Sequence, residues 1–322
     1  MYIDLPESQL ADYRSAQTDP ADFDAFWDET IAAARDAASV VQIEPVDSGL
    51  STLDVFDVTF SGWDGQPVKA WLRVPKGATA PLPAVVEYVG YGGGRGHVLE
   101  NLLWASAGFA HFQMDTRGQG SGWSVGATAD DAGSGPQRPG MMTRGIDSRE
   151  SYYYRRVFTD AVRAVETVRD LPLVDASRVS VFGRSQGGGI ALAVAGLVPG
   201  LAGVAPCVPF LCDFPRATVI TDAYPYKEIG DFLAVHRDKA ELVASVLPYF
   251  DGVNFARHAT APALFSAAQM DSTCPPSTIY GAYNVYAGEK SMSLWTYNGH
   301  EGGGIVDEER AIAFFRSNDG RR

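Results

Sequence analysis

The stretch RVSVFGRSQGGGIALAVAGL, residues 178–197, decides the fold of this chain. Its first part, Arg178–Phe182, predicts a short strand, and its last part, Gly188–Leu197, predicts a helix. Between them lies Gly183-Arg184-Ser185-Gln186-Gly187, where glycines two positions before and after a serine permit a sharp turn from strand to helix. Such a turn lifts the serine hydroxyl above the sheet, so Ser185 is the candidate nucleophile.

Strands and helices alternate on both sides of this turn. The predicted strands are Leu53–Phe60, Val68–Val74, Ala84–Val89, Phe109–Met114, Leu201–Val208, Ala263–Ala267 and Ser293–Tyr297. The predicted helices are Pro20–Ala38, Leu102–Ala107, a long helix that carries Val157, Ala161, Val165 and Val168, and then Ile279–Ala287 and Glu308–Phe315. This alternation predicts a mainly parallel sheet covered by helices on both faces. Together with the serine turn it indicates an α/β protein with the α/β-hydrolase fold.

The chain shows no internal repeat or linker that would divide it, so we expect a single domain over residues 1–322. Residues 1–75 add an N-terminal helix and a hairpin around Trp63-Asp64-Gly65. Residues 213–259 interrupt the alternation and are predicted to be helical and polar. We expect them to be an insertion over the carboxyl-terminal edge of the sheet, where they could act as a lid.

A serine hydroxyl needs a base, and in this fold an acid and then a histidine follow the nucleophile in the chain. His300 lies in a glycine-rich loop after the last predicted strand. His236 and His258 lie in the insertion, where we expect solvated surface residues. Asp271 directly follows the strand at 263–269 and is expected to orient the imidazole of His300.

Other assignments for the acid stay open at this stage. Asp271 would also suit the cap of a helix over the following residues. Its rivals as the catalytic acid all lie in the insertion: Asp213, Asp222, Asp231, Asp238 and Asp251.

Two backbone N–H groups are candidates for an oxyanion hole. One belongs to Gln186, at the start of the helix after the nucleophile, and the other to Tyr91, in the glycine-rich loop after Ala84–Val89. The alternative for Tyr91 is a plain glycine turn without catalytic duty. Arg117 lies close to the predicted sheet edge, and we interpret it as a scaffold residue that needs a partner carboxylate if it is buried.

Composition excludes several classes of partner. The chain has 26 basic and 39 acidic residues, a formal charge of −13 that disfavours nucleic acid and anionic membranes. Its three cysteines lack metal-ligand spacing, and its glycine clusters lack the dinucleotide-binding pattern, so no metal or cofactor is expected. No membrane-length apolar run and no secretory signal are visible, which favours the cytoplasm.

Three motifs occur in an order that resembles a known family. Arg117-Gly118-Gln119, Gly183–Gly187 and His300-Glu301 are similar to the signature of carbohydrate esterase family seven, the acetyl xylan esterase and cephalosporin C deacetylase group. The resemblance implies that Ser185, Asp271 and His300 form the triad. It also implies that Tyr91 and Gln186 donate to the oxyanion.

The same resemblance implies an esterase that removes acetyl groups from sugars such as short xylo-oligosaccharides, and also from cephalosporin C. Members are intracellular hexamers with a narrow acyl pocket, to which Tyr91, Trp123 and Pro225 correspond here. Gly92 departs from the pattern, where a bulkier polar residue is expected. The competing interpretations are a serine peptidase or acyltransferase of the same fold and, from another class, a non-catalytic binding protein.

Overall fold

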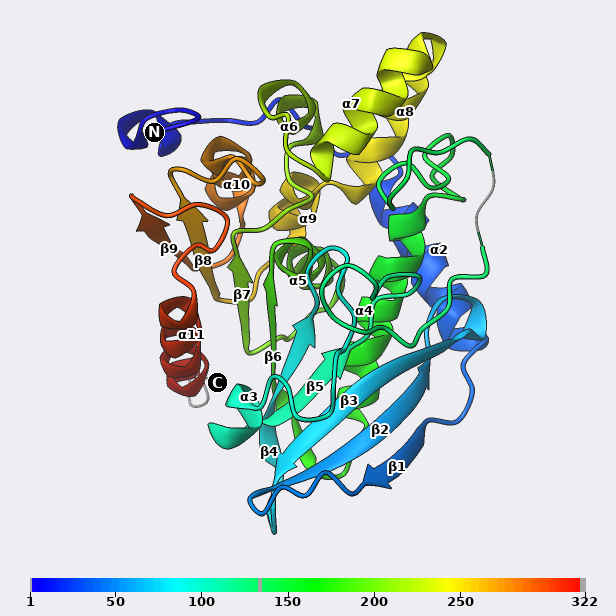
Figure 1. Ribbon diagram of the computed structural model, residues 1–322, viewed down its shortest axis with the longest axis vertical. Coiled ribbons are helices and arrows are strands. Elements are labelled where there is room, and N and C mark those ends of the chain that lie inside the picture. Colours follow the sequence, from blue (N-terminus) through cyan, green and yellow to red (C-terminus); the bar gives the residue numbers. More distant parts are fainter. Residues whose placement is uncertain (1, 133–134, 319–322) are drawn as a thin grey trace.

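The computed structural model describes residues 2–132 and 135–318. Its strands form one sheet in the order β1-β2-β3-β5-β4-β6-β7-β8-β9 (Figure 1). The strands are β1 (Gln42–Val46), β2 (Leu53–Ser61), β3 (Pro67–Pro75), β4 (Leu82–Tyr88), β5 (Ala110–Met114), β6 (Val174–Arg184), β7 (Gly203–Cys207), β8 (Ala263–Ala268) and β9 (Lys290–Trp295). The pairs from β1 through β3 to β5 are antiparallel, and all pairs from β5 to β9 are parallel.

Helices cover both faces of this sheet. They are α1 (Glu7–Leu10), α2 (Phe23–Asp36), α3 (Leu103–Ser106), α4 (Tyr153–Arg169), α5 (Gln186–Leu197), α6 (Phe214–Ile220), α7 (Tyr226–Val235), α8 (Ala240–Val246), α9 (Gly252–His258), α10 (Pro276–Val285) and α11 (Ile305–Asn318). A large apolar core joins α2, α4, α5, α9 and α10 to one face, and a smaller core joins α3 and α11 to the other. The predicted α/β-hydrolase fold is confirmed. Among the described helices, none is both long and apolar enough to cross a bilayer.

Two sheet elements differ from the sequence-based expectation. Strand β1 was not predicted, because its residues are mostly exposed at the sheet edge, so it has no apolar alternation to detect, and Pro45 lies within it. Strand β9 begins and ends earlier than predicted, since its pairing with β8 runs from Lys290 to Trp295. Residues 296–300 therefore belong to the loop that carries His300.

Between β7 and β8, residues 213–259 hold helices α6 to α9. Although this stretch is polar in composition, its inner side is apolar, since Phe214, Tyr226 and Phe250 are fully buried. His258 is not simply solvated as predicted: its Nε2 lies 2.8 Å from Asp19 Oδ2 and its ring stacks on Phe23. This stretch is therefore packed into the molecule by its aromatic residues.

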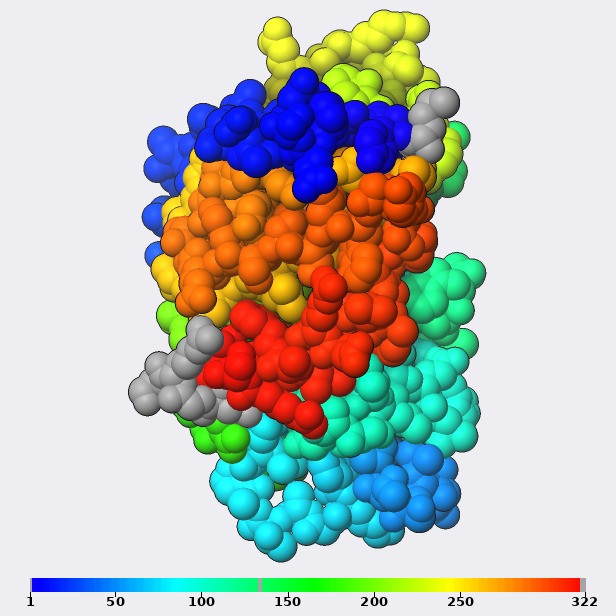
Figure 2. Space-filling view, turned by 90° about the vertical axis from the view of Figure 1, so that its left-hand side faces the viewer, coloured from blue at the N-terminus to red at the C-terminus, as the bar shows by residue number. Residues whose placement is uncertain are grey.

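The N-terminal segment lies across the C-terminal third of the chain. Figure 2 shows the dark-blue N-terminal residues resting on the orange region that holds α10 and β9. The amide of Asn284 in α10 donates to the carbonyls of Leu10 and Tyr13, and Asp4 accepts from the backbone of Ser277. These contacts close the core beneath α10 from the outside.

Arg117 has the partner carboxylate that its burial requires. Its guanidinium donates from Nε to Asp160 Oδ2 over 2.6 Å and from Nη2 to Asp160 Oδ1 over 2.8 Å, and both side chains are fully buried. Nη1 donates to Gln66 Oε1, and Asp160 also accepts from the backbone of Trp63. The pair therefore joins the hairpin, α4 and the loop after β5.

Replacing Asp160 by Asn should destabilise the protein by about 3–5 kcal/mol, because it removes the carboxylate that binds the buried guanidinium through two hydrogen bonds. The carboxylate that remains near Arg117, Asp130 at 3.6 Å, is already shared with Arg144 and Arg156. Chemical unfolding followed by tryptophan fluorescence measures the change. Asp222→Asn is the matched control, since Asp222 pairs with Lys227 while 93% exposed. Equal midpoints for the two variants would contradict the structural role of the buried pair.

Candidate active site

The turn between β6 and α5 holds Ser185 in an unusual backbone conformation, with φ 57° and ψ −120°. The two glycines of the motif permit it. A Cβ on Gly183 would lie 2.1 Å from the carbonyl oxygen of Gly187, and a Cβ on Gly187 would lie 2.0 Å from that of Tyr88. Only glycine allows these backbones to approach so closely, which explains the spacing of the motif.

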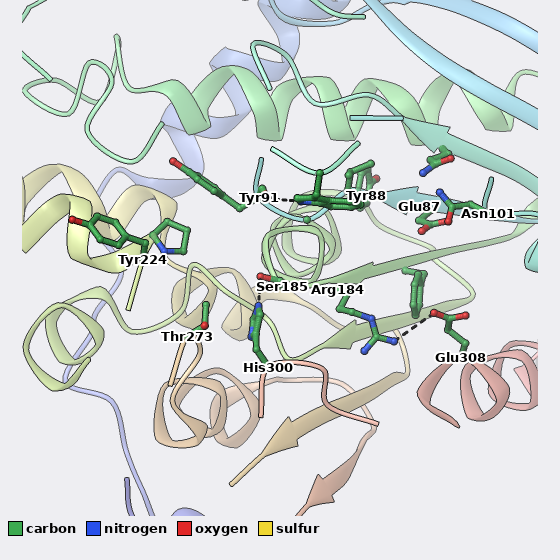
Figure 3. A pocket seen from close by; sticks show the side chains of 16 residues that line it. Glu87, Tyr88, Tyr91, Asn101, Arg184, Ser185, Tyr224, Thr273, His300 and Glu308 are labelled. Carbon is green, nitrogen blue, oxygen red and sulfur yellow. Dashed lines mark hydrogen bonds and ion pairs between the residues drawn. The ribbon is translucent and has the colours of Figure 1, made fainter. Parts of the chain in front are cut away.

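Ser185, Asp271 and His300 follow the carboxyl ends of β6, β8 and β9, and Figure 3 shows the Ser185 and His300 side chains facing each other. His300 Nε2 lies 2.9 Å from Ser185 Oγ, and His300 Nδ1 lies 2.8 Å from Asp271 Oδ2. An imidazole that donates from Nδ1 to the carboxylate keeps Nε2 free to accept the serine proton. The His300 side chain is 35% exposed, so solvent reaches this group.

Asp271 makes the contacts that both of the roles considered from the sequence require. It is fully buried, and while Oδ2 contacts His300, Oδ1 accepts from the backbone N–H groups of Thr273 and Cys274, each over 2.8 Å. The aspartate therefore also organises the turn that leads into α10. None of the rival aspartates has a contact with His300 in the described part of the chain.

The loop of His300 is held by the residue next to the nucleophile. Arg184 donates from Nη1 to the carbonyl of Glu301 over 3.0 Å and from Nη2 to the carbonyl of Gly304 over 2.9 Å. It thereby ties the end of β6 to the loop that carries the imidazole. Sequence analysis missed this role, because the motif predicts only the glycines and the serine.

The loop after β4 is tied to the nucleophile turn through glutamine side chains. Gln119 Oε1 accepts from the N–H of Gly92 over 2.7 Å, and its Nε2 donates to Gln186 Oε1 over 2.8 Å. Tyr154, at the start of α4, donates to the same oxygen of Gln186. The N–H of Tyr91 has no hydrogen-bond partner among the described residues, so it remains available to a ligand.

The backbone at position 92 accounts for a glycine where the sequence comparison led us to expect a bulkier polar residue. Its φ of +79° is a conformation that glycine adopts at little cost. A Cβ there would only reach ordinary contact with Gly122 and Trp123. The loop is therefore shaped by glycine geometry and by the bond to Gln119.

The Tyr91 side chain is anchored by the insertion. Its hydroxyl donates to Glu228 Oε1 over 2.7 Å and accepts from the backbone of Met141 over 2.5 Å, and Glu228 Oε2 accepts from Met142. Burial raises the pKa of Glu228, and the bond from Tyr91 opposes this rise. Sequence analysis missed Glu228, which lies far along the chain in a helix with no recognisable motif.

A cavity of about 540 Å³ opens beside the serine and histidine. The three residues expected to shape an acyl pocket, Tyr91, Trp123 and Pro225, all line it. Trp123 donates from its indole to the carbonyl of Tyr91 over 2.8 Å. A second group of lining residues was not anticipated: Glu87, Asn101, Gln113, Arg184 and Glu308.

One group of side chains in the described residues has atoms close enough to hold a metal ion. Ligand atoms of Asp271, Cys274 and His300 lie within 4.8 Å of one another. Both ring nitrogens of His300 are already engaged, by Asp271 and Ser185. Burial and the charge of Asp271 raise the pKa of the Cys274 thiol, so it remains protonated and a poor ligand. The arrangement favours hydrogen bonding over metal binding.

A nucleophile turn above a mainly parallel sheet, with its histidine delivered from the last loop, places the protein in the α/β-hydrolase class. Comparison with known proteins identifies the family within this class. The model of the acetyl xylan esterase family (AXE1) matches residues 1–318. The chain belongs to the acetyl xylan esterase family, as its motifs suggested.

Solved structures agree with this assignment. An acetyl xylan esterase from Paenibacillus sp. R4 is 41% identical, with a TM-score of 0.92 over 97% of this chain and 99% of that one. Acetyl xylan esterase 1 from Thermoanaerobacterium sp. JW/SL YS485 is 30% identical, with a TM-score of 0.90 over 98% and 100%.

A longer relative also matches. Acetyl esterase Axe7A of Xylanibacter ruminicola is 28% identical over 87% of this chain, which spans 63% of the length of that relative. An acylaminoacyl peptidase at 18% identity and a TM-score of 0.59 shares the fold alone.

Replacing Gly187 by Ala should lower stability by about 1–3 kcal/mol, because the new methyl group must push β4 away from the nucleophile turn. Thermal unfolding measures the effect. Gly230→Ala in α7 is the control, since its Cβ would meet only one atom at 4.0 Å and alanine favours helix. If Gly187→Ala unfolded at the same temperature as Gly230→Ala, the close approach would not constrain the turn.

Proposed function

We propose that this protein is a serine esterase that removes acetyl groups from acetylated sugars, short xylo-oligosaccharides among them, through an acyl-enzyme on Ser185. The observation that carries the proposal is the unbroken hydrogen-bonded chain from Ser185 through His300 to Asp271, in a member of the acetyl xylan esterase family. Cephalosporin C, an ester that the family resemblance also implies, is a second substrate to assay.

In the proposed reaction His300 takes the proton of Ser185 as the serine oxygen attacks the acetyl carbonyl. The N–H groups of Tyr91 and Gln186 then donate to the oxyanion, each contributing about 3 kcal/mol. Protonated His300, stabilised by Asp271, gives the proton to the leaving alcohol. A water molecule activated by the same histidine attacks the acyl-enzyme and releases acetate.

The shape of the acyl site supports short chains. The Tyr91 hydroxyl is bound to Glu228, and the indole of Trp123, a residue that is 66% exposed, donates to the backbone carbonyl of Tyr91, so these two contacts limit how far the wall can move. Pro225 adds a rigid ring to the same cavity. We therefore assign Tyr91, Trp123 and Pro225 to an acetyl-sized pocket.

Hydrolysis is favoured over the rival reactions of this fold. An acyltransferase must keep water from its acyl-enzyme, whereas the His300 side chain is 35% exposed at an open cavity. A peptidase that recognises a substrate amine needs a carboxylate near the acyl site, and Glu228 there is occupied by Tyr91 and Met142. A non-catalytic binding protein would not need His300 to be hydrogen-bonded to both Ser185 and Asp271.

We also propose a cytoplasmic hexamer, on the basis of the family resemblance. The three cysteines are free and buried, which suits a reducing compartment. Light scattering coupled to size-exclusion chromatography tests the assembly, and a monomer or dimer at working concentration would contradict it.

Replacing Ser185 by Ala should remove hydrolysis of 4-nitrophenyl acetate, with a loss on the order of 10⁶-fold in kcat for enzymes of this type. Labelling by a fluorophosphonate should disappear with it. Ser245→Ala is the control, because Ser245 is exposed on α8 and bonds only to its own helix. Activity near the wild-type level in Ser185→Ala would reject the nucleophile.

Lengthening the acyl chain from acetate through butyrate to octanoate should reduce kcat/KM by about tenfold or more at the first step, since extra methylenes overpack a rigid wall. The 4-nitrophenyl esters keep the leaving group constant. A flat profile would leave the esterase proposal standing and remove the acetyl specificity.

A further inference from the structure

The loop that carries His300 has few side chains with which to hold its shape. Three of the four residues after the histidine are glycines, and two of them, Gly302 and Gly304, have φ angles of +56° and +54°. The His300 side chain is 35% exposed, so packing alone does not fix the imidazole. Its position therefore depends on how the backbone of the loop is held.

The two limbs of this loop are held in different ways. Before the histidine, the N–H of Gln269 donates to the carbonyl of Trp295 over 2.9 Å. The N–H of Met270 donates to the carbonyl of Asn298 over 3.1 Å, so the pairing of β8 with β9 continues into the first limb. The second limb, residues 301–304, is held by side chains instead.

Asp307, in the first turn of α11, is a buried acceptor for the second limb. Its side chain is 2% exposed, and its Oδ2 accepts from the backbone N–H of Gly303 over 2.9 Å. A Cβ on Gly303 would lie 2.6 Å from Asp307 Oδ1 and 2.3 Å from the ring of Trp295. The backbone of the loop therefore lies directly against both side chains.

The Asp307 carboxylate is itself fixed by the last two strands of the sheet. Its Oδ2 also accepts from Ser266 Oγ in β8 over 2.9 Å, and its Oδ1 accepts from Trp295 Nε1, at the end of β9, over 2.9 Å. A carboxylate in the first turn of a helix commonly stabilises that helix, which would explain the bond to Gly303 alone. The bonds to β8 and β9 do more, because they set where the loop lies relative to the sheet.

Arg184 completes the support of the second limb, with Asp307 beside it. Its Nη1 lies 3.7 Å from Asp307 Oδ2, and its two Nη atoms donate to the carbonyls of Glu301 and Gly304. Figure 3 shows this guanidinium extending toward Glu308. The loop thus receives donors from a guanidinium and an acceptor from a carboxylate, and the two opposite charges compensate each other in a partly buried place.

We propose that Asp307 is a positioning residue for His300. By holding Gly303 against the sheet and balancing the charge of Arg184, it keeps the imidazole within hydrogen-bond reach of Ser185. This rests on the proposed esterase function, in which His300 is the base. A misplacement of about 1 Å can lower the rate of a reaction about 100-fold, so this contact matters although Asp307 is not among the described residues that line the cavity.

Labelling by a fluorophosphonate tests the proposal, because it reports two quantities. The final amount of label counts the molecules whose site is folded, and the rate constant of labelling reports how well His300 activates Ser185. Asp307→Ala removes every acceptor of the carboxylate. It should reach the wild-type amount of label with a rate constant about 10- to 100-fold lower, and kcat/KM for 4-nitrophenyl acetate should fall by a similar factor.

Asp307→Asn is the conservative variant, because it loses the charge but keeps one acceptor oxygen. Its rate constant should lie between those of Asp307→Ala and the wild type. If Asp307→Ala fails to fold, Asp307→Asn alone carries the test, with an expected slowing of about threefold or more. Glu309→Gln is the matched control, because it removes a negative charge from the same helix at an exposed position, and it should label as the wild type does.

The outcomes separate the two proposals. If the wild-type protein neither takes up the label nor hydrolyses 4-nitrophenyl acetate, the proposed function is rejected and the positioning role falls with it. If Asp307→Ala takes up less label but at the wild-type rate, Asp307 only stabilises the fold, and the positioning role alone is overturned. Wild-type rates in the folded Asp307 variants, or an equal slowing in Glu309→Gln, would overturn it as well.

Discussion

The close approach of Gly187 to the carbonyl of Tyr88 constrains the whole site. It requires β4, β6 and α5 to converge at one point, where an added Cβ would lie 2.0 Å from the carbonyl oxygen. Because β4 ends at Tyr88 and Tyr91 follows three residues later, the same contact also places Tyr91 beside Ser185. The nucleophile and its proposed oxyanion loop are therefore positioned together, and neither can shift without the other.

Buried polar pairs hold the loops around the site, which the close packing of β4, β6 and α5 does not by itself fix. Glycine-rich loops have few side chains with which to pack, so their shape depends on hydrogen bonds. Gln119 supplies them to Gly92 and Gln186, while Arg117 and Asp160 hold the start of the same loop in the core. Arg117 and Gln119, two residues apart in one motif, thus have two physical tasks: the arginine anchors the loop, and the glutamine joins it to the turn that carries Ser185.

Sequence reasoning reached the parts of the site that have local patterns. Ser185 has its glycines, and His300 and Asp271 follow strands in a fixed chain order, so all three could be predicted and do meet in the structure. Glu228 and Glu308 could not be predicted. Each lies on a helix, and the spacing of apolar residues in a helix indicates only which of its faces is buried. Their importance comes from long-range packing, which the spacing of residues along the chain does not encode.

The two sides of the cavity come from different parts of the fold, and this has a consequence for specificity. The proposed acyl side, formed by Tyr91, Trp123 and Pro225, comes from the loops after β4 and β5 and from the segment between β7 and β8. On the opposite side, Glu87, Gln113, Arg184 and Glu308 lie on β4, β5, β6 and α11. Substitutions at Glu87 or Glu308 should therefore leave the proposed acyl wall in place. Arg184 is the exception, because it contributes charge to this side of the cavity and also holds the loop of His300. A change at Arg184 would therefore alter both the charge of the cavity and the position of His300, the proposed base.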